Sequence, residues 1–149
     1  MVLRDILGKH SLPVDFCVLY IGVIHNWLTP AEVISVIENH LLKKLSEKEI
    51  IDLYFVESKQ DAILFLRQKL HSSKIDDCSH TLKIWWKAYL LEIISTNSST
   101  DEKIELVANY WSYFNYPEEW KEFINYMPQK QVFGKDNLYH KILEFIENL

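Results

Sequence analysis

Two adjacent glutamates and a dense set of aromatic rings are the residues of this chain best suited to do chemistry. Six carboxylates and eight aromatic rings lie between Thr100 and Met127. Glu118 and Glu119 have the side-chain type of a general acid and base. They directly follow Pro117, however, and acids in a first helical turn ordinarily complement the helix dipole. We therefore assign them to a helix start and a surface, and we predict no catalytic residue.

A second set of chemically capable side chains surrounds Cys78. All five are of types that bind zinc: His71, Asp76, Asp77, Cys78 and His80. Cys78 and His80 are two residues apart, which places them on different sides of a helix, and neither CxxC nor HExxH is present. We expect a solvated loop between helices here, and neither a metal site nor any other cofactor.

Nucleophile and phosphate motifs are absent from the sequence. Cys17 has apolar neighbours, which indicate a core position instead of a reactive thiol. Two cysteines do not make a disulfide framework, so we expect both to be reduced. The three glycines lie too far apart for a phosphate-binding loop, and no GxSxG occurs. These observations favour a protein that is not an enzyme.

Composition and charge narrow the classes of partner. The net charge is −5, and the second half of the chain carries the whole acidic excess. No cation cluster of the kind that holds DNA or RNA is present, so we expect no direct nucleic-acid ligand. A basic protein is a better electrostatic match. Apolar runs are broken by charge well before about 18 residues, which predicts a cytoplasmic protein without a membrane span.

Helix caps are the clearest structural signals in the chain. Residues 29–32 combine an N-cap threonine, a proline at the first helical position and a glutamate three residues on. Residues 46–49 form a second capping box, and residues 99–102 place two acids in a first helical turn. Few glycines and prolines remain to make hairpins. The sequence therefore predicts an all-α fold.

Apolar spacing completes the list of helices and their inward faces. Residues 15–25 read as a buried helix, although their composition also permits a strand. Further helices are expected from 30, from 47, after 58, over 79–94, from 100, over 117–126 and over 136–147, with a loop at 129–135. The helix after Ser46 presents an apolar face of Ile50, Ile51, Tyr54 and Phe55. We predict one domain, residues 1–149, built as a compact bundle of about seven or eight helices.

Three segments resemble a family of uncharacterised small bacterial proteins. They are residues 22–34 (GVIHNWLTPAEVI), 114–120 (FNYPEEW) and 123–128 (FINYMP). The resemblance covers most of the chain and implies a small, cytoplasmic, all-helical protein. Similar proteins often accompany polymorphic toxins as immunity partners. The resemblance implies no catalytic residue.

These observations together predict a protein-binding domain, and most specifically an immunity protein that neutralises a cognate toxin. Trp111, Phe114 and Phe123 fit buried positions, whereas other rings of the acidic segment can face a partner while partly packed. The expected partner is a protein such as a basic toxin domain, and the sequence sets no oligomeric state. The predicted contact residues are Asp101, Glu102, Glu105, Tyr113, Tyr116, Glu118, Glu119, Trp120 and Glu122.

Two alternatives belong to other functional classes. A general adaptor or regulatory scaffold would use the same kind of surface without inhibiting its partner. An enzyme with an unrecognised active site would instead contain a concave polar pocket that holds titratable side chains.

Overall fold

A computed structural model describes residues 10, 12–124 and 135–149 of the chain. Within these residues the fold is all-α, with seven α-helices, short 3₁₀ and π segments and no strand. The predicted fold class is confirmed. The chain divides into two compact units, Met1–Trp85 (unit 1) and Trp86–Leu149 (unit 2). The single-domain assignment for residues 1–149 stays a prediction.

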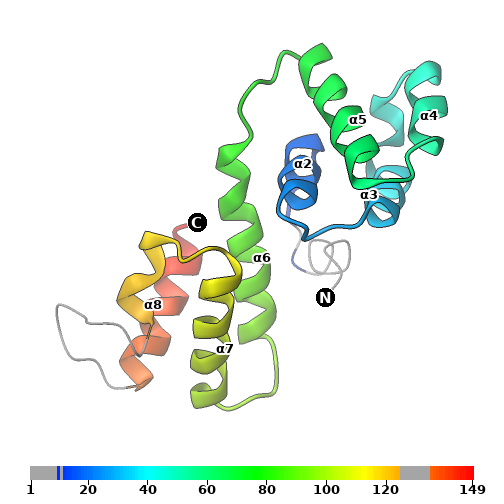
Figure 1. Ribbon diagram of the computed structural model, residues 1–149. Helices are drawn as coiled ribbons and strands as arrows, with labels where there is room; N and C mark the ends of the chain where they lie inside the picture. The colour runs from blue at the N-terminus through cyan, green and yellow to red at the C-terminus, as the bar shows by residue number, and fades with distance from the viewer. Residues whose placement is uncertain (1–9, 11, 125–134) are drawn as a thin grey trace. The chain divides into compact units, whose positions relative to one another are not determined.

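Unit 1 begins with α2 (Phe16–Ile24), whose N-cap Asp15 accepts a hydrogen bond from the backbone N–H of Val18. The helix predicted over residues 15–25 is therefore confirmed, and the alternative of a strand is wrong. The elements that follow are α3 (Pro30–Val36), a π segment (Ile37–Leu41), a 3₁₀ turn (Leu42–Lys44), α4 (Glu47–Tyr54), α5 (Lys59–Ser72) and a 3₁₀ turn (Ser79–Thr81). Helix α2 packs against α5 and α3 (Figure 1).

The capping boxes predicted at α3 and α4 are both present. Thr29 and Glu32 exchange side-chain to backbone hydrogen bonds at the start of α3, as do Ser46 and Glu49 at the start of α4. A third capping box, Ser58 with Asp61, opens α5. Each box satisfies backbone donors that a helix start leaves without intrahelical partners.

The core of unit 1 is centred on α2 and the indole of Trp85. Trp85, in the first turn of α6 (Leu82–Ile94), is fully buried, and its Nε1 donates a hydrogen bond to the carbonyl oxygen of Val18 at 3.1 Å. The Trp27 ring lies 5.0 Å from the Trp85 ring, measured between centroids. The paired Nε1–H lets a large polar ring be buried without a desolvation penalty for an unpaired donor.

A disulfide between Cys17 and Cys78 joins α2 to the segment before the Ser79–Thr81 turn. The prediction that both cysteines are reduced is therefore wrong. Folding brings the two Cα atoms to 5.1 Å although they are 61 residues apart, a proximity that counting cysteines does not reveal. The predicted core position of Cys17 is confirmed, since only 3% of its surface is exposed.

Unit 2 contains the rest of α6, α7 (Thr100–Tyr113), a 3₁₀ segment (Glu118–Phe123) and α8 (Lys135–Glu147). Helix α7 lies beside α8, which also contacts the 3₁₀ segment (Figure 1). The core combines aliphatic side chains of α7 and α8 with a set of rings. The buried rings include Trp86, Tyr89, Trp111, Phe114, Trp120 and Phe123.

The predicted boundaries in unit 2 hold at α7 and α8 and differ after Pro117. The helix expected over 117–126 is a 3₁₀ segment that ends at Phe123, where Ile124 becomes extended. Helix α8 begins one residue before the predicted start at Asp136. Tyr126 and all but the last residue of the loop predicted at 129–135 lie outside the described residues.

Candidate functional site

The exposed face of α7 carries half of the acidic residues predicted to contact a partner. Asp101, Glu102 and Glu105 are exposed near its start, and Tyr113 is exposed at its end. Residues 102, 105, 109, 112 and 113 follow the three-four spacing that places side chains on one side of a helix. All five are exposed. The helix therefore presents carboxylates at one end and a tyrosine at the other.

A Schellman turn continues this face beyond the end of α7. Asn115 has φ 64°, and the backbone N–H of Tyr116 donates to the carbonyl oxygen of Trp111 at 2.8 Å. Asn115 donates in the same way to Ser112 at 3.0 Å. Tyr116 is also in the left-handed region, with φ 55°. The turn fixes the direction in which the Tyr116 ring leaves the helix.

Both exposed tyrosines are held by neighbouring rings. The Tyr113 ring lies 5.7 Å from the Tyr89 ring and 5.4 Å from that of Phe114, yet 44% of Tyr113 is exposed. The Tyr116 ring meets the Trp111 ring edge-on at 4.9 Å, and 57% of Tyr116 is exposed. A ring that is fixed before binding loses little conformational entropy in a complex.

Carboxylates of the 3₁₀ segment extend the exposed set. Glu118, Glu119 and Glu122 are all exposed, and Glu118 forms an ion pair with Lys121 at 2.8 Å. We call the exposed predicted residues of unit 2 the tyrosine–carboxylate surface. Its members are Asp101, Glu102, Glu105, Tyr113, Tyr116, Glu118, Glu119 and Glu122.

Trp120, which the sequence analysis placed on this surface, is buried in the core of unit 2. Its exposed fraction is 0%, and its ring contacts those of Trp86 at 6.2 Å and Phe123 at 5.8 Å between centroids. Within the described residues, Nε1 of Trp120 and of Trp86 has no hydrogen-bond acceptor. In this conformation the Trp120 side chain cannot reach a partner. Its buried ring instead supports the 3₁₀ segment that carries Glu118, Glu119 and Glu122.

Partial burial changes the acidity of one tyrosine beside the surface. Burial raises the pKa of the Tyr110 hydroxyl above its ordinary value, and the neighbouring Tyr113 adds to the increase. The Tyr110 ring packs on both Tyr89 and Tyr113, at 5.1 and 5.6 Å. Tyr110 therefore remains a neutral hydroxyl at physiological pH and can donate a hydrogen bond.

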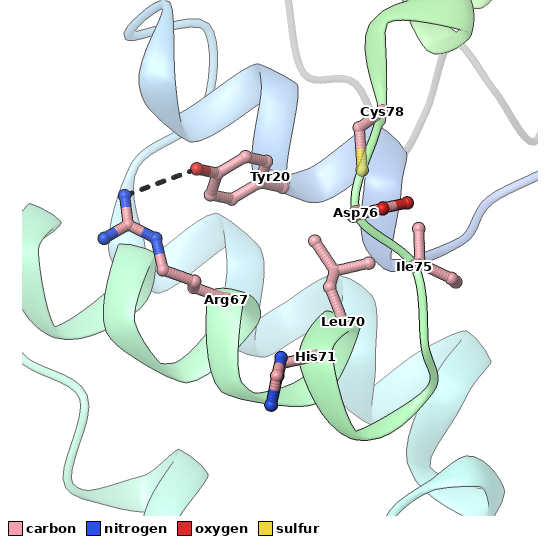
Figure 2. Close-up of a pocket in the computed structure, with 7 residues that line it drawn as sticks. All are labelled: Tyr20, Arg67, Leu70, His71, Ile75, Asp76 and Cys78. Carbon is pink, nitrogen blue, oxygen red and sulfur yellow. Dashed lines mark hydrogen bonds between the residues drawn. The ribbon is translucent and has the colours of Figure 1, made fainter.

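Unit 1 has a separate hollow beside the disulfide (Figure 2). Its volume is about 250 Å³, and it is lined by Tyr20, Arg67, Leu70, His71, Ile75, Asp76 and Cys78. Arg67 Nη2 lies 3.5 Å from the Tyr20 hydroxyl, with His71 one helical turn further along α5. Its charged side chains are exposed. The Arg67 guanidinium, the His71 imidazole and the Asp76 carboxylate therefore line the same hollow.

The residues weighed as zinc ligands are divided by the fold. His71, Asp76 and Cys78 all line the hollow, but Cys78 is bonded to Cys17 and is not a thiolate. The Asp77 carboxylate accepts a hydrogen bond from the backbone N–H of Ser79 at 3.0 Å, which lowers the pKa of Asp77. In the described part of the chain, no group of three or more histidine, cysteine or acidic side chains is placed to hold a metal ion.

Comparison with known proteins identifies a family for the chain. Residues 5–148 match the family described as uncharacterized protein conserved in bacteria (DUF2247). The chain belongs to this family. The match confirms the resemblance to uncharacterised bacterial proteins. No curated protein and no solved structure matches the chain. Across the described ranges, no helix has both the length and the apolarity needed to cross a bilayer.

Unit 1 exposes an apolar cluster that was not predicted from the sequence. Three residues of the predicted inward face of the helix after Ser46 are exposed, at 59% for Ile51, 57% for Tyr54 and 74% for Phe55. That part of the prediction is wrong, because α4 directs Leu53 inward, with 0% exposed. Apolar residues occur on two sides of this helix, so their spacing alone does not tell which side is buried.

Proposed function

We propose that this chain is a non-catalytic protein-binding domain that binds and neutralises a cognate bacterial toxin. The observation that carries the proposal is the tyrosine–carboxylate surface of unit 2. Two half-exposed tyrosines, each fixed by packed rings, stand among six exposed carboxylates. Tyrosine is enriched among the residues that dominate binding energy, and carboxylates speed encounter with a basic partner.

In the proposed mechanism, the carboxylates attract the basic catalytic face of the toxin. Tyr113 and Tyr116 then pack into that face, and the bound domain blocks access of substrate. Trp120 takes no direct part and instead supports the 3₁₀ segment that holds Glu118 and Glu119. No cofactor is required, because inhibition follows from covering the site.

The first test is capture of partners from a lysate of the source organism with the tagged protein. We expect one stoichiometric enzyme whose activity falls when the purified domain is added. A folded bait that captures no such enzyme contradicts the toxin-neutralising role. Capture of an enzyme whose activity stays unchanged contradicts it too and favours an adaptor.

The second test places the contact surface. Replacement of both tyrosines, Tyr113→Ser with Tyr116→Ser, should weaken the complex at least about tenfold, since central aromatic anchors contribute more than about 1.4 kcal/mol. Glu119→Lys with Glu122→Lys should slow association most at low salt. Ile75→Ser is the control, because Ile75 in unit 1 is nearly as exposed as Tyr113, at 41%, and lies outside both proposed protein contact surfaces. Equal losses in all variants would contradict this location.

A further inference from the structure

Unit 1 exposes a cluster of large apolar side chains that the proposed toxin contact does not use. Ile51, Tyr54 and Phe55 at the end of α4 and Leu64 in the middle of α5 are each more than half exposed, at 59, 57, 74 and 53%. Residues 51, 54 and 55 lie within one helical turn of each other. Contiguous apolar patches on a folded domain mark binding sites more often than isolated exposed residues do.

Two members of this cluster, Phe55 and Leu64, also line a groove that two neighbouring hollows form along α4 and α5. One, of about 180 Å³, is lined by Phe55 and Leu64 together with acidic and apolar residues of both helices. The other, of about 300 Å³, extends toward the start of α4. The two share Asp52, Phe65 and Gln68 as lining residues, so they are continuous. A groove between two helices can accept the side-chain ridge of a third.

The apolar end of the groove has a negative rim. Asp52 and Asp61 line the same hollow as Phe55 and Leu64, and the exposed Glu57 directly follows Val56, another lining residue. The Asp61 carboxylate accepts hydrogen bonds from the backbone N–H groups of Glu57 and Ser58, just before α5, whereas the Asp52 side chain has no partner among the described residues. Asp52 is therefore an acceptor still available to a ligand.

The nearby cations do not neutralise this rim. Lys59 donates to the carbonyl oxygen of Ile24 at 3.5 Å, and Lys69 pairs with Glu49 at 3.2 Å. Arg67 points to the Tyr20 hydroxyl on another side of α5. Lys48 lines the larger hollow together with Asp52, but the described structure contains no ion pair between their side chains. The Phe55 end thus combines apolar surface with net negative charge.

We propose that this groove binds an amphipathic helix of a partner protein, with apolar residues three or four apart flanked by lysine or arginine. The apolar ridge packs against Phe55 and Leu64, and the flanking cations meet Asp52 and Glu57. A symmetric pairing of two copies of this chain through the same end would bring two acidic rims together, which is unfavourable. The proposal is independent of the toxin contact in unit 2.

The test uses the full chain, with its disulfide intact, to select binders from a phage-displayed library of randomised helical peptides. Enriched peptides should carry the basic amphipathic pattern. Binding of synthesised examples should fall at least tenfold for Phe55→Ser with Leu64→Ser and also for Asp52→Lys, and should fall with added salt. Ile75→Ser, an exposed apolar residue of unit 1 outside the groove, should leave binding unchanged.

Several outcomes would overturn the proposal. Failure to enrich any sequence, enrichment of acidic peptides, or binding that survives both groove variants would each contradict it. Concentration-dependent dimerisation in sedimentation that disappears in Phe55→Ser with Leu64→Ser would assign the groove to a second copy instead. Asp52→Lys changes only an exposed side chain, so it remains informative if the double variant fails to fold.

Discussion

Gly22 lies where α2 meets the indole of Trp85 and the side chain of Leu28. A Cβ atom at this position would contact Trp85 Cζ2 and lie 2.7 Å from Leu28 Cδ1. An alanine in an unobstructed helix interior would be stabilising relative to glycine by about 0.5–1 kcal/mol. Here we expect Gly22→Ala to lower the free energy of unfolding by about 1–3 kcal/mol, because the core must shift to admit the methyl group.

Chemical denaturation monitored by tryptophan fluorescence measures this change. Gly22→Ala introduced into a Leu28→Ala background should be less destabilising than in the wild type, since the Leu28 side chain that obstructs the methyl group is then absent. If Gly22→Ala alone increased the free energy of unfolding, the side chains of Trp85 and Leu28 would be able to move away from the methyl group without destabilising the core. That result would contradict the prediction.

His25 should make stability depend on pH. Its ring stacks on that of Trp27 at 4.6 Å, and burial, assisted by the positive charge of Lys59, lowers the pKa of His25 below 6.5. The folded state therefore resists protonation more than the unfolded state does. Well above pH 6.5, His25 is neutral in both states and its protonation does not change the free energy of unfolding. As the pH falls through 6.5, the unfolded state binds the proton first and the free energy of unfolding decreases, until the folded state also binds it.

The measurement compares unfolding of the wild type and His25→Gln between pH 7.5 and pH 5. We expect the wild type to lose more stability over this range than the variant. In addition, Lys59→Gln should shift the midpoint of an NMR titration of His25 upward, because it removes a neighbouring positive charge. Identical pH slopes for the wild type and His25→Gln would contradict this assignment.

Helix ends show which structural features could be predicted from the sequence. The starts of α3 and α4 were predicted correctly, because a capping box is formed by four consecutive residues. The buried side of α4 was not, since packing against other helices determines it. The same distinction applies to the proposed contact surface: the acidic residues of α7 are exposed as local spacing indicated, whereas Trp120 is buried by rings from other segments.

Three helices end in Schellman turns without glycine at the left-handed position. Asn26, Lys74 and Asn115 have φ of 62°, 59° and 64° at the ends of α2, α5 and α7. Asparagine tolerates this conformation better than lysine does. We therefore expect Lys74→Gly to raise the free energy of unfolding by about 0.5–1 kcal/mol, with a smaller gain for Asn26→Gly.

Ser73 provides the matched control for Lys74→Gly, measured by the same denaturant unfolding. It directly precedes Lys74 but has φ −90°, where glycine brings no conformational benefit. Ser73→Gly should therefore lower stability while Lys74→Gly raises it. Equal effects of the two substitutions would show that the conformation of residue 74 does not limit the stability of this turn.

At the scale of the whole molecule, charge and covalent linkage are unevenly distributed. The acidic excess lies in the second half of the chain, which includes the tyrosine–carboxylate surface, whereas both cysteines lie in unit 1. The acidic excess of the second half could be predicted by counting charged residues in the sequence. The disulfide could not, because it depends on how 61 intervening residues fold.

Reduction of the Cys17–Cys78 disulfide should destabilise unit 1 far more than unit 2. Closing a loop of 61 residues in the unfolded chain corresponds to a stabilisation of about 4 kcal/mol in the chain-entropy model. Hydrogen exchange of the oxidised and reduced protein measures the effect segment by segment. We expect lost protection in α2 and α5, and little change in α7 and α8, because each unit is compact by itself and the disulfide lies within unit 1.

A Cys17→Ser, Cys78→Ser variant serves as the control for direct effects of the reductant, because it has no disulfide with or without the reducing agent. Its exchange pattern should resemble that of the reduced wild type and should not respond to the reducing agent. Equal loss of protection in α7 and α8 would mean that the two units unfold together, which would support the single-domain prediction. Unchanged protection in α2 would show that packing around the buried Cys17 already holds this helix without the covalent link.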